Sequence, residues 1–281
     1  MKMRANAKDL VPLVRMGRTA STVPTGEAFR PEWIDFENGI RVGNLEPHER
    51  ITQILKHNLE QRHGTPFVTD RWGRGVFWQW ICWLPRANRE AKPVSHGVNF
   101  GCAKFFISLD RDERTFEFGL QVERGYLPRA SAGGERRRAN EMRLRRRGEE
   151  EAAGWVLQDD WDWHRLLKLC AKGTALDAEM ARLVRREGFV AAVEGTGGAI
   201  ALRGREFESA AQVRSAARRC AADQWAGFQL YYPMPEKEVR SCTGYELVTA
   251  VLAAYGAVLP VMNMCMQVPL ASPSSAPRLR V

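Results

Sequence analysis

A two-residue alternation at residues 115–123 constrains the fold of this chain more than any other pattern in its sequence. In "TFEFGLQVER" every second residue is apolar: Phe116, Phe118, Leu120 and Val122. Successive side chains of a strand point to opposite faces of the sheet, so this period predicts a β-strand with one buried face. The run at 98–109 is also strand-like and is linked to this strand by the short polar stretch "DRDER", which predicts an antiparallel hairpin.

The polar side of the same strand carries Glu117 and Glu123, six residues apart. By strand rise the two carboxylates lie about 20 Å apart, too far for a paired acid–base site. We therefore expect solvent to surround this side of the strand.

Helical patterns dominate the second half of the sequence. Runs at 159–173, 175–188 and 206–222 have apolar residues at helical spacing, and residues 189–204 match a hairpin around "GTGG". Residues 225–235 match a strand that ends at prolines. The predicted fold is α+β, with an antiparallel sheet and packed helices in the N-terminal half and a mainly helical C-terminal half with a short hairpin.

Composition divides the chain into five predicted segments. Residues 1–43 are expected to form an irregular N-terminal arm, and residues 44–127 the sheet-containing α/β half. Apolar residues nearly vanish at 128–154, which indicates an Arg-rich flexible linker or insertion. Residues 155–268 are expected to form the mainly helical half, and residues 269–281 a disordered tail.

The stretch 247–265 is long and apolar enough to suggest a membrane span. Thr243 and Glu246 match a capping box, which predicts that a helix starts there. Pro260 is expected to end or kink that helix, because proline removes a backbone hydrogen bond. The remaining length suits a buried helix packed on a sheet, so we expect a core helix and leave a membrane anchor open.

Positive charge is the main compositional signal. The chain carries 42 basic and 33 acidic residues, a formal net charge of +9. Its arginines outnumber its lysines, which favours bidentate phosphate contacts, although a GC-rich genome also raises the arginine content. The run "RRRANEMRLRRR" at 136–147 is expected to be an exposed arm that either grips a polyanion by counterion release or is a solvated linker. Its arginines are Arg136, Arg137, Arg138, Arg143, Arg145, Arg146 and Arg147.

Two further sets of residues are candidates for nucleic-acid contact. In "DRWGRG", Trp72 lies between Arg71 and Arg74, where an exposed indole can stack on a base beside phosphate-binding guanidinium groups. The nearby Trp78 and Trp80 are predicted to share one strand face and to belong to the core. The second set lies on the outer face of the helix predicted at 206–222: Arg214, Arg218 and Arg219.

Signatures of catalysis are absent from the sequence. It contains no P-loop, no complete G-x-G-x-x-G, no nucleophile elbow and no H-E-x-x-H. The six cysteines lack metal-ligand spacing, so buried free thiols in a reducing cytosol are expected, and a nucleophilic pair of Cys102 with His96 is a minor alternative. A turn rather than a divalent-metal site is expected where four carboxylates cluster: Asp110, Asp112, Glu113 and Glu117.

These patterns favour a non-enzymatic, cytoplasmic nucleic-acid-binding protein that acts as a subunit of a larger assembly, without cofactor or metal. Whether the nucleic acid is DNA or RNA stays open. One alternative is a protein–protein interaction module without nucleic acid, whose contact surface includes Met262, Met264 and Met266. A second is an enzyme whose site is assembled from distant residues, such as a metal-dependent nuclease.

Overall fold

An antiparallel sheet of nine strands runs through the residues that the computed structural model describes, which are 25–92, 101–124, 161–221 and 225–271. The strand order is β1-β2-β4-β5-β6-β9-β7-β8, and β3 pairs with β4 outside this path. The strands are β1 (Ile34–Asp35), β2 (Gly39–Arg41), β3 (Phe67–Arg74), β4 (Phe77–Pro85), β5 (Lys104–Asp110), β6 (Thr115–Glu123), β7 (Val190–Gly195), β8 (Ile200–Arg203) and β9 (Ala226–Pro235).

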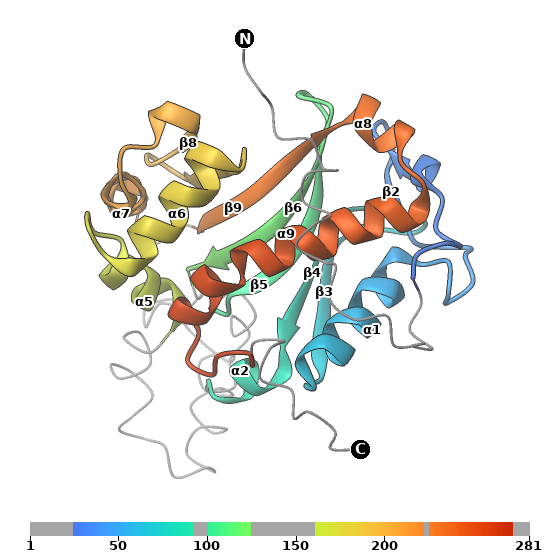
Figure 1. Cartoon of the computed structure of the whole chain (residues 1–281), viewed down its shortest axis with the longest axis horizontal. Coiled ribbons are helices and arrows are strands. Elements are labelled where there is room, and N and C mark those ends of the chain that lie inside the picture. The colour runs from blue at the N-terminus through green and yellow to red at the C-terminus, as the bar shows by residue number, and fades with distance from the viewer. Residues whose placement is uncertain (1–24, 93–100, 125–160, 222–224, 272–281) are drawn as a thin grey trace, which may run out of the picture.

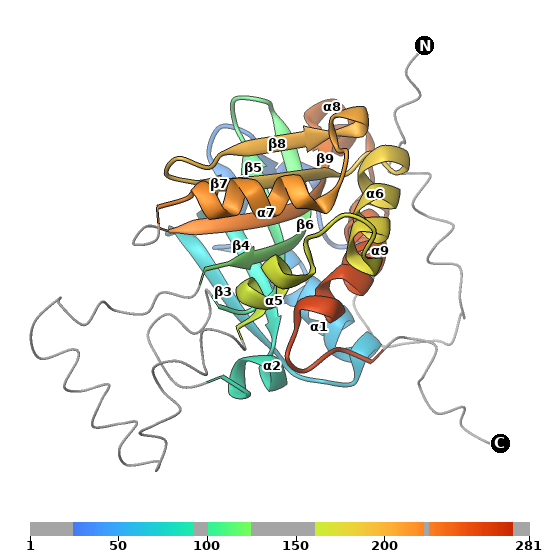
Figure 2. The same cartoon turned by 90° about the vertical axis from the view of Figure 1, so that its left-hand side faces the viewer.

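Helices cover one face of this sheet (Figures 1 and 2), which we call the helix face. Buried residues of six of the described helices join one large apolar core with the strands. The opposite, helix-free face carries Trp80, Phe106 and Tyr231, and its smaller apolar cluster contains no residue of a described helix. The described α-helices are α1 (Ile51–His63), α2 (Arg86–Glu90), α5 (Asp162–Leu169), α6 (Ala175–Arg186), α7 (Ala210–Arg219), α8 (Glu236–Ser241) and α9 (Gly244–Cys265).

The predicted division into a sheet half and a mainly helical half is wrong. The structure is an α+β fold in which both halves build one large sheet, although strands dominate the N-terminal half. Strand β9 pairs with β6 along its whole length, from Thr115↔Pro235 to Glu123↔Gly227, and β7 extends the sheet beyond β9. Sequence periodicity reveals strands but not which strands pair, so this long-range pairing escaped prediction.

The alternation along β6 is confirmed and explains how the two faces differ. Its apolar residues are fully buried on the helix face, where β6 packs against α9. Each such side chain contributes on the order of 2 kcal/mol of hydrophobic stabilisation. On the other face Glu117 is half-buried, while Glu123 is only 4% exposed. Solvent therefore does not surround Glu123, contrary to the prediction.

Helix α9 is the central helix of the core. Thr243 and Glu246 form the predicted capping box, and Thr243 Oγ1 accepts the Glu246 N–H at 3.2 Å. Tyr255 donates its hydroxyl to the Phe106 carbonyl on β5 at 3.0 Å. Of the two expected effects of Pro260, the end of the helix is wrong, because α9 continues to Cys265. Pro260 and the residue four positions earlier, Gly256, are both exposed, so water reaches the carbonyl that the proline leaves free.

The burial of α9 bears on whether it crosses a membrane. Among the described residues it is the one helix long and apolar enough to do so, and 72% of its most apolar window is buried within the protein. This packing favours the interpretation of α9 as a core helix.

A β-bulge in the β3–β4 hairpin turns two neighbouring tryptophans to opposite faces. The register passes from Trp72↔Trp80 to Gly73↔Trp78, which leaves Gln79 as an extra residue on β4. Trp78 therefore packs against the core of the helix face, whereas Trp80 packs against the cluster of the helix-free face. The prediction that Trp78 and Trp80 share a face is wrong, because a two-residue period does not continue across a bulge.

A buried polar cluster around Asp162 fixes four parts of the chain. The Asp162 carboxylate lies 3.0 Å from Lys92 Nζ and accepts hydrogen bonds from Asn88 Nδ2 at 2.7 Å and Ala103 N–H at 2.6 Å. Asn88 in turn accepts the N–H groups of residues 267 and 268. Removal of one partner would leave a buried charge unpaired, so the cluster holds α2, the start of β5, α5 and the chain after α9 in fixed relative positions.

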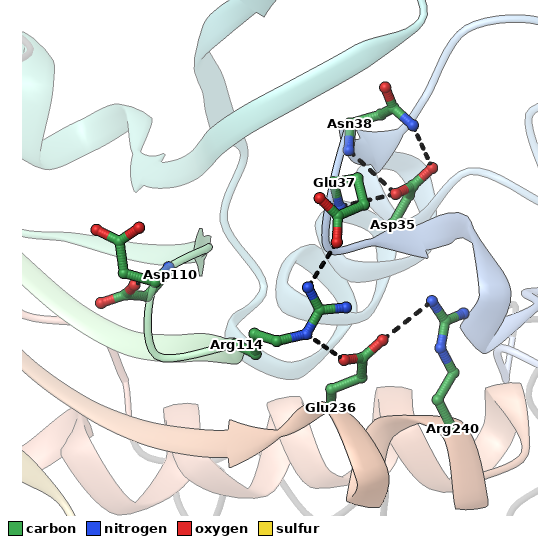
Figure 3. Close-up of polar contacts among 8 residues, drawn as sticks. Asp35, Glu37, Asn38, Asp110, Arg114, Glu236 and Arg240 are labelled. Carbon is green, nitrogen blue, oxygen red and sulfur yellow. Dashed lines mark hydrogen bonds and ion pairs between the residues drawn. The ribbon is translucent and has the colours of Figure 1, made fainter.

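An exposed network of ion pairs links the β1–β2 hairpin to the β5–β6 turn and to helix α8 (Figure 3). Arg114, in the β5–β6 turn, donates Nη1 to Glu37 at 2.5 Å and Nε to Glu236 on α8 at 2.7 Å. Arg240 lies 3.6 Å from Glu236. The hydrogen bonds that Arg114 donates to Glu236 and then to Glu37 raise the pKa of Arg114 above its usual value. The network thereby links β1–β2, β5–β6 and α8.

Two glycine-to-alanine substitutions are expected to change stability in opposite directions. A Cβ at Gly119 would lie 2.1 Å from the Leu230 carbonyl oxygen, so Gly119→Ala forces β6 and β9 apart and lowers the free energy of unfolding by about 2 kcal/mol or more. At Gly256, on the exposed side of α9, the nearest atom is 3.6 Å away, so Gly256→Ala stabilises the helix by up to about 1 kcal/mol. Urea unfolding measures both changes, and equal shifts would contradict the close approach of β6 to β9.

Candidate nucleic-acid interface

Residues from four neighbouring strands form one row across the helix-free face. Trp72 on β3 pairs with Trp80 on β4, Trp80 pairs with Ser108 on β5, and Ser108 pairs with Glu117 on β6. Directly paired residues project from the same face of a sheet. Trp72 is 72% exposed and the other three are half-buried, so solvent reaches the whole row. From strand spacing, Trp72 and Glu117 lie about 14 Å apart. We call these residues the Trp72–Glu117 row.

Two arginine positions lie on the same face of the sheet as this row. Arg41 on β2 and Arg74 on β3 both pair with Phe77 of β4, from its two sides. The alternation along β3 and the bulge in β4 place both positions on the helix-free face. Arg74 is two residues from Trp72 on β3, whereas Arg41 lies across β4, on the edge of β4 that also pairs with β5. Arg41 Nε is buried and makes no hydrogen bond with any described residue. We call the positions of Arg41 and Arg74 the basic corner.

Arg71 differs from its neighbours because it belongs to the helix face. It pairs with Ile81, a residue of the helix-face core, and its guanidinium lies 4.0 Å from the centroid of the Trp78 ring. Such a cation–π contact is worth about 0.5–1 kcal/mol at an exposed site. Arg71 and Trp72 therefore point away from each other, and the predicted flanking of Trp72 by Arg71 does not occur on one face.

Glu117 ends the row in a set of polar side chains from four strands. It accepts a hydrogen bond from Ser108 Oγ at 3.1 Å and one from the Tyr231 hydroxyl. Tyr231, on β9, is also hydrogen-bonded to Arg203 of β8. The carboxyl is thus held in one orientation while part of its surface remains accessible.

Burial raises the pKa of Glu117 to about 7. The nearby carboxylates Asp110 and Glu194 raise it further, while the hydrogen bonds from Ser108 and Tyr231 oppose the rise. The group therefore titrates near neutral pH, which is a frequent property of functional carboxyls.

A buried ion pair occupies the same face farther along the strands. Lys104 on β5 pairs with Glu123 on β6, which also accepts the Trp225 Nε1–H at 2.8 Å. Trp80 donates its indole N–H to Gln121 at 2.7 Å. These groups satisfy one another, so we assign them a structural role in fixing the Trp80 ring within the row.

The arginines predicted on the helix at 206–222 lie on the other side of the sheet. Helix α7 packs Val213 and Ala217 into the helix-face core. Arg218 and Arg219 are exposed in its last turn, whereas Arg214 is half-buried. The strand order places five strand spacings, about 24 Å, between β3 and β7. The structure therefore does not bring these arginines together with Trp72.

The Arg-rich run at 136–147 lies outside the described residues, and its seven predicted contacts stay predictions. The described residues contain 27 basic and 24 acidic side chains, a net charge of +3. Since the whole chain carries +9, the remaining +6 belongs to residues outside the described ranges. Two thirds of the net positive charge of the chain therefore lies outside the described ranges.

The described residues offer little support for the enzyme alternative. Burial raises the pKa of Cys102 to about 11, so its thiol is neutral at physiological pH, and its predicted partner His96 lies outside the described ranges. Asp110 accepts the N–H groups of Asp112 and Glu113 at 2.9 and 3.0 Å, as in an ordinary polar turn. Within the described parts of the chain, no group of three or more His, Cys, Asp or Glu residues suits a metal ion.

The methionines predicted to cover a protein partner lie inside the protein. Met262 and Met266 are fully buried, and Met264 packs against the same core. They therefore do not form the partner surface that the sequence suggested.

The sequence did not reveal the residues that join Trp72 in the structure. Arg41 lies in the segment predicted to be an irregular arm, and Ser108 lies in the strand-like run at 98–109, where it was not predicted to be a functional residue. Glu117 was assigned to a solvated strand face. The missing information is the register between strands, which single-strand periodicity does not contain.

The chain matches no protein-family model, no curated protein and no solved structure. The function of the Trp72–Glu117 row is therefore inferred from its geometry and chemistry.

Glu117 is expected to weaken the fold as the pH rises. The unfolded chain releases this proton near the ordinary pKa of 4.5, whereas the folded protein retains it up to about pH 7, so the free energy of unfolding falls between these values. Glu117→Gln removes this titration. The variant is expected to match the native protein at pH 4 and to exceed its stability by up to about 3 kcal/mol at pH 8, as measured by urea unfolding.

Glu46→Gln is the matched control, because Glu46 is an exposed carboxylate in the loop before α1. Its stability should follow the native protein at both pH values. If Glu117→Gln behaved in the same way, the assigned titration of Glu117 would be wrong.

Proposed function

We propose that this protein is a non-enzymatic binder of single-stranded nucleic acid, DNA or RNA, and that Trp72 stacks on an unpaired base. The observation that carries the proposal is the 72% exposure of the Trp72 side chain beside the basic corner. A large apolar side chain is rarely so exposed without a partner, and an aromatic ring beside arginines suits a base and its phosphates.

Single strands are favoured over duplexes by the kind of contact available. A planar ring binds the face of a base, and that face is accessible when the base is unpaired. An open antiparallel sheet face with an aromatic residue offers such a platform. A duplex would instead require an element that enters a groove, and Trp72 lies on a strand of the sheet.

The charge distribution supports contact of a phosphate near Trp72. The basic group there is at the position of Arg74, two residues beyond Trp72 on β3, whereas the acidic group of Asp110, Glu117 and Glu194 lies farther across the helix-free face. Phosphates would be attracted to the first group and repelled by the second. The Arg-rich run at 136–147 would add sequence-independent affinity through counterion release.

Trp72→Ala is expected to lower the affinity for single-stranded oligonucleotides about tenfold, because stacking on one base is worth about 1–3 kcal/mol. Fluorescence anisotropy with labelled oligonucleotides measures the change. Tyr245→Ala is the matched control, since Tyr245 is another exposed aromatic residue, 50% exposed at the start of α9. Equal affinities for native protein and Trp72→Ala would exclude this site as the binding platform.

Salt dependence distinguishes the basic corner from helix α7. Arg41→Gln is expected to reduce the slope of log affinity against log salt by about 0.7, the value for one phosphate contact on a single strand. The double variant Arg218→Gln, Arg219→Gln should leave the slope unchanged if the strand lies on the helix-free face. The reverse pattern would move the interface to α7.

The Arg-rich run is tested in the same assay by replacing its seven arginines with serine. Lower affinity with a flatter salt dependence is expected, because the run carries most of its segment's positive charge. An unchanged slope would exclude the run as a phosphate-binding arm.

A further inference from the structure

Glu117 is the functional group of the row that the proposed stacking contact leaves unused. It lies about 14 Å from Trp72 by strand spacing, so a single base cannot touch both residues. The two residues nevertheless belong to one continuous row on the same open face, through Trp80 and Ser108. A strand that crosses the sheet from Trp72 would bring a second base to Glu117.

The surroundings of Glu117 are unfavourable for phosphate and suitable for a base edge. The charged and titratable groups that face it are Asp110 from β5, Tyr231 from β9, Arg203 through Tyr231, and Glu194 from β7. The two carboxyl groups in this set, together with Glu117 itself when it is ionised, repel a phosphate. A neutral base that presents N–H donors would instead find oriented oxygen acceptors.

We propose that Glu117 binds the Watson–Crick edge of an unpaired guanine when a single strand is stacked on Trp72. An ionised carboxylate presents two acceptor oxygens, and guanine presents two adjacent donors, N1–H and the N2 amino group. Cytosine and adenine each present one donor beside one acceptor, so they match a carboxylate poorly. This inference rests on the proposed function, since it requires a single strand on the helix-free face.

The charge state of Glu117 makes the base preference dependent on pH. A protonated carboxyl presents one donor and one acceptor, which matches the edges of cytosine and adenine and also the O6 and N1–H of guanine, so guanine loses its advantage. Because burial raises the pKa of Glu117 to about 7, the carboxylate form prevails at pH 8.5 and the acid form at pH 6. Guanine should therefore be preferred in the alkaline buffer, and the preference should disappear in the acidic one.

The experiment compares labelled dodecamers in which thymine alternates with guanine, cytosine or adenine, bound to the full chain at pH 6 and pH 8.5. Native protein is expected to bind the guanine oligonucleotide about tenfold more tightly than the cytosine one at pH 8.5, since a good bidentate contact is worth about 1–3 kcal/mol. Glu117→Gln presents one donor and one acceptor at every pH, so it should lose the guanine preference at pH 8.5.

Two control variants separate this inference from simpler explanations. Glu194→Gln removes an exposed negative charge from the same face, so it should change the affinity for all three oligonucleotides equally. Circular dichroism confirms that each variant is folded. Trp72→Ala should lower the affinity for all three oligonucleotides and keep the preference for guanine.

The outcomes distinguish the inference from the proposed function. If Glu117→Gln keeps the native guanine preference at pH 8.5, or if the native protein shows none, Glu117 does not read the base, while the Trp72 platform stands. If the native protein binds none of the oligonucleotides, the proposed function fails and this inference fails with it.

Discussion

The pairing of β6 with β9 is the interaction on which the rest of the structure depends. Nine residue pairs join a strand of the N-terminal half to a strand of the C-terminal half. Strand β6 presents its apolar side to α9, and β9 extends the sheet to β7 and β8, which α6 and α7 cover. Both halves therefore share one core. Because these contacts are distant in sequence, their loop-closure cost is large, and extensive burial on the helix face compensates for it.

The bulge opposite Trp72 determines what the helix-free face can offer. If Gln79 were part of a regular strand instead of a bulge, the two-residue period of β4 would place Trp78 and Trp80 on the same side. With it, Trp78 supports the helix-face core and the Arg71 guanidinium, while Trp80 joins Trp72 in the row. The bulge thus directs one tryptophan of the hairpin toward the helix-face core, where it adds stability, and another toward the face that is proposed to bind a ligand.

Local features of the sequence were more predictable than distant ones. The alternation of β6, the β5–β6 hairpin and the capping box of α9 followed from short-range patterns and are confirmed. Helix α1 begins at Ile51, after a turn at residues 46–50. Three features were not predictable: the single sheet shared by both halves, the pairing of Trp72 with Trp80, and the buried Lys104–Glu123 ion pair. Each depends on strand register, and the candidate site consists mainly of such register contacts.

The residues on both sides of the segment 125–160 are held in place by hydrogen bonds, and this determines what a backbone cut within that segment would do. Arg124 donates to the Ala221 carbonyl at 2.5 Å, and Asp162 lies in its buried cluster with Asn88 and Lys92. None of the described strand pairs lies within 125–160. A protease cut there would sever the backbone without breaking a described hydrogen bond of the sheet. The two fragments would then remain associated as a noncovalent complex, held together by the pairing of β6 with β9.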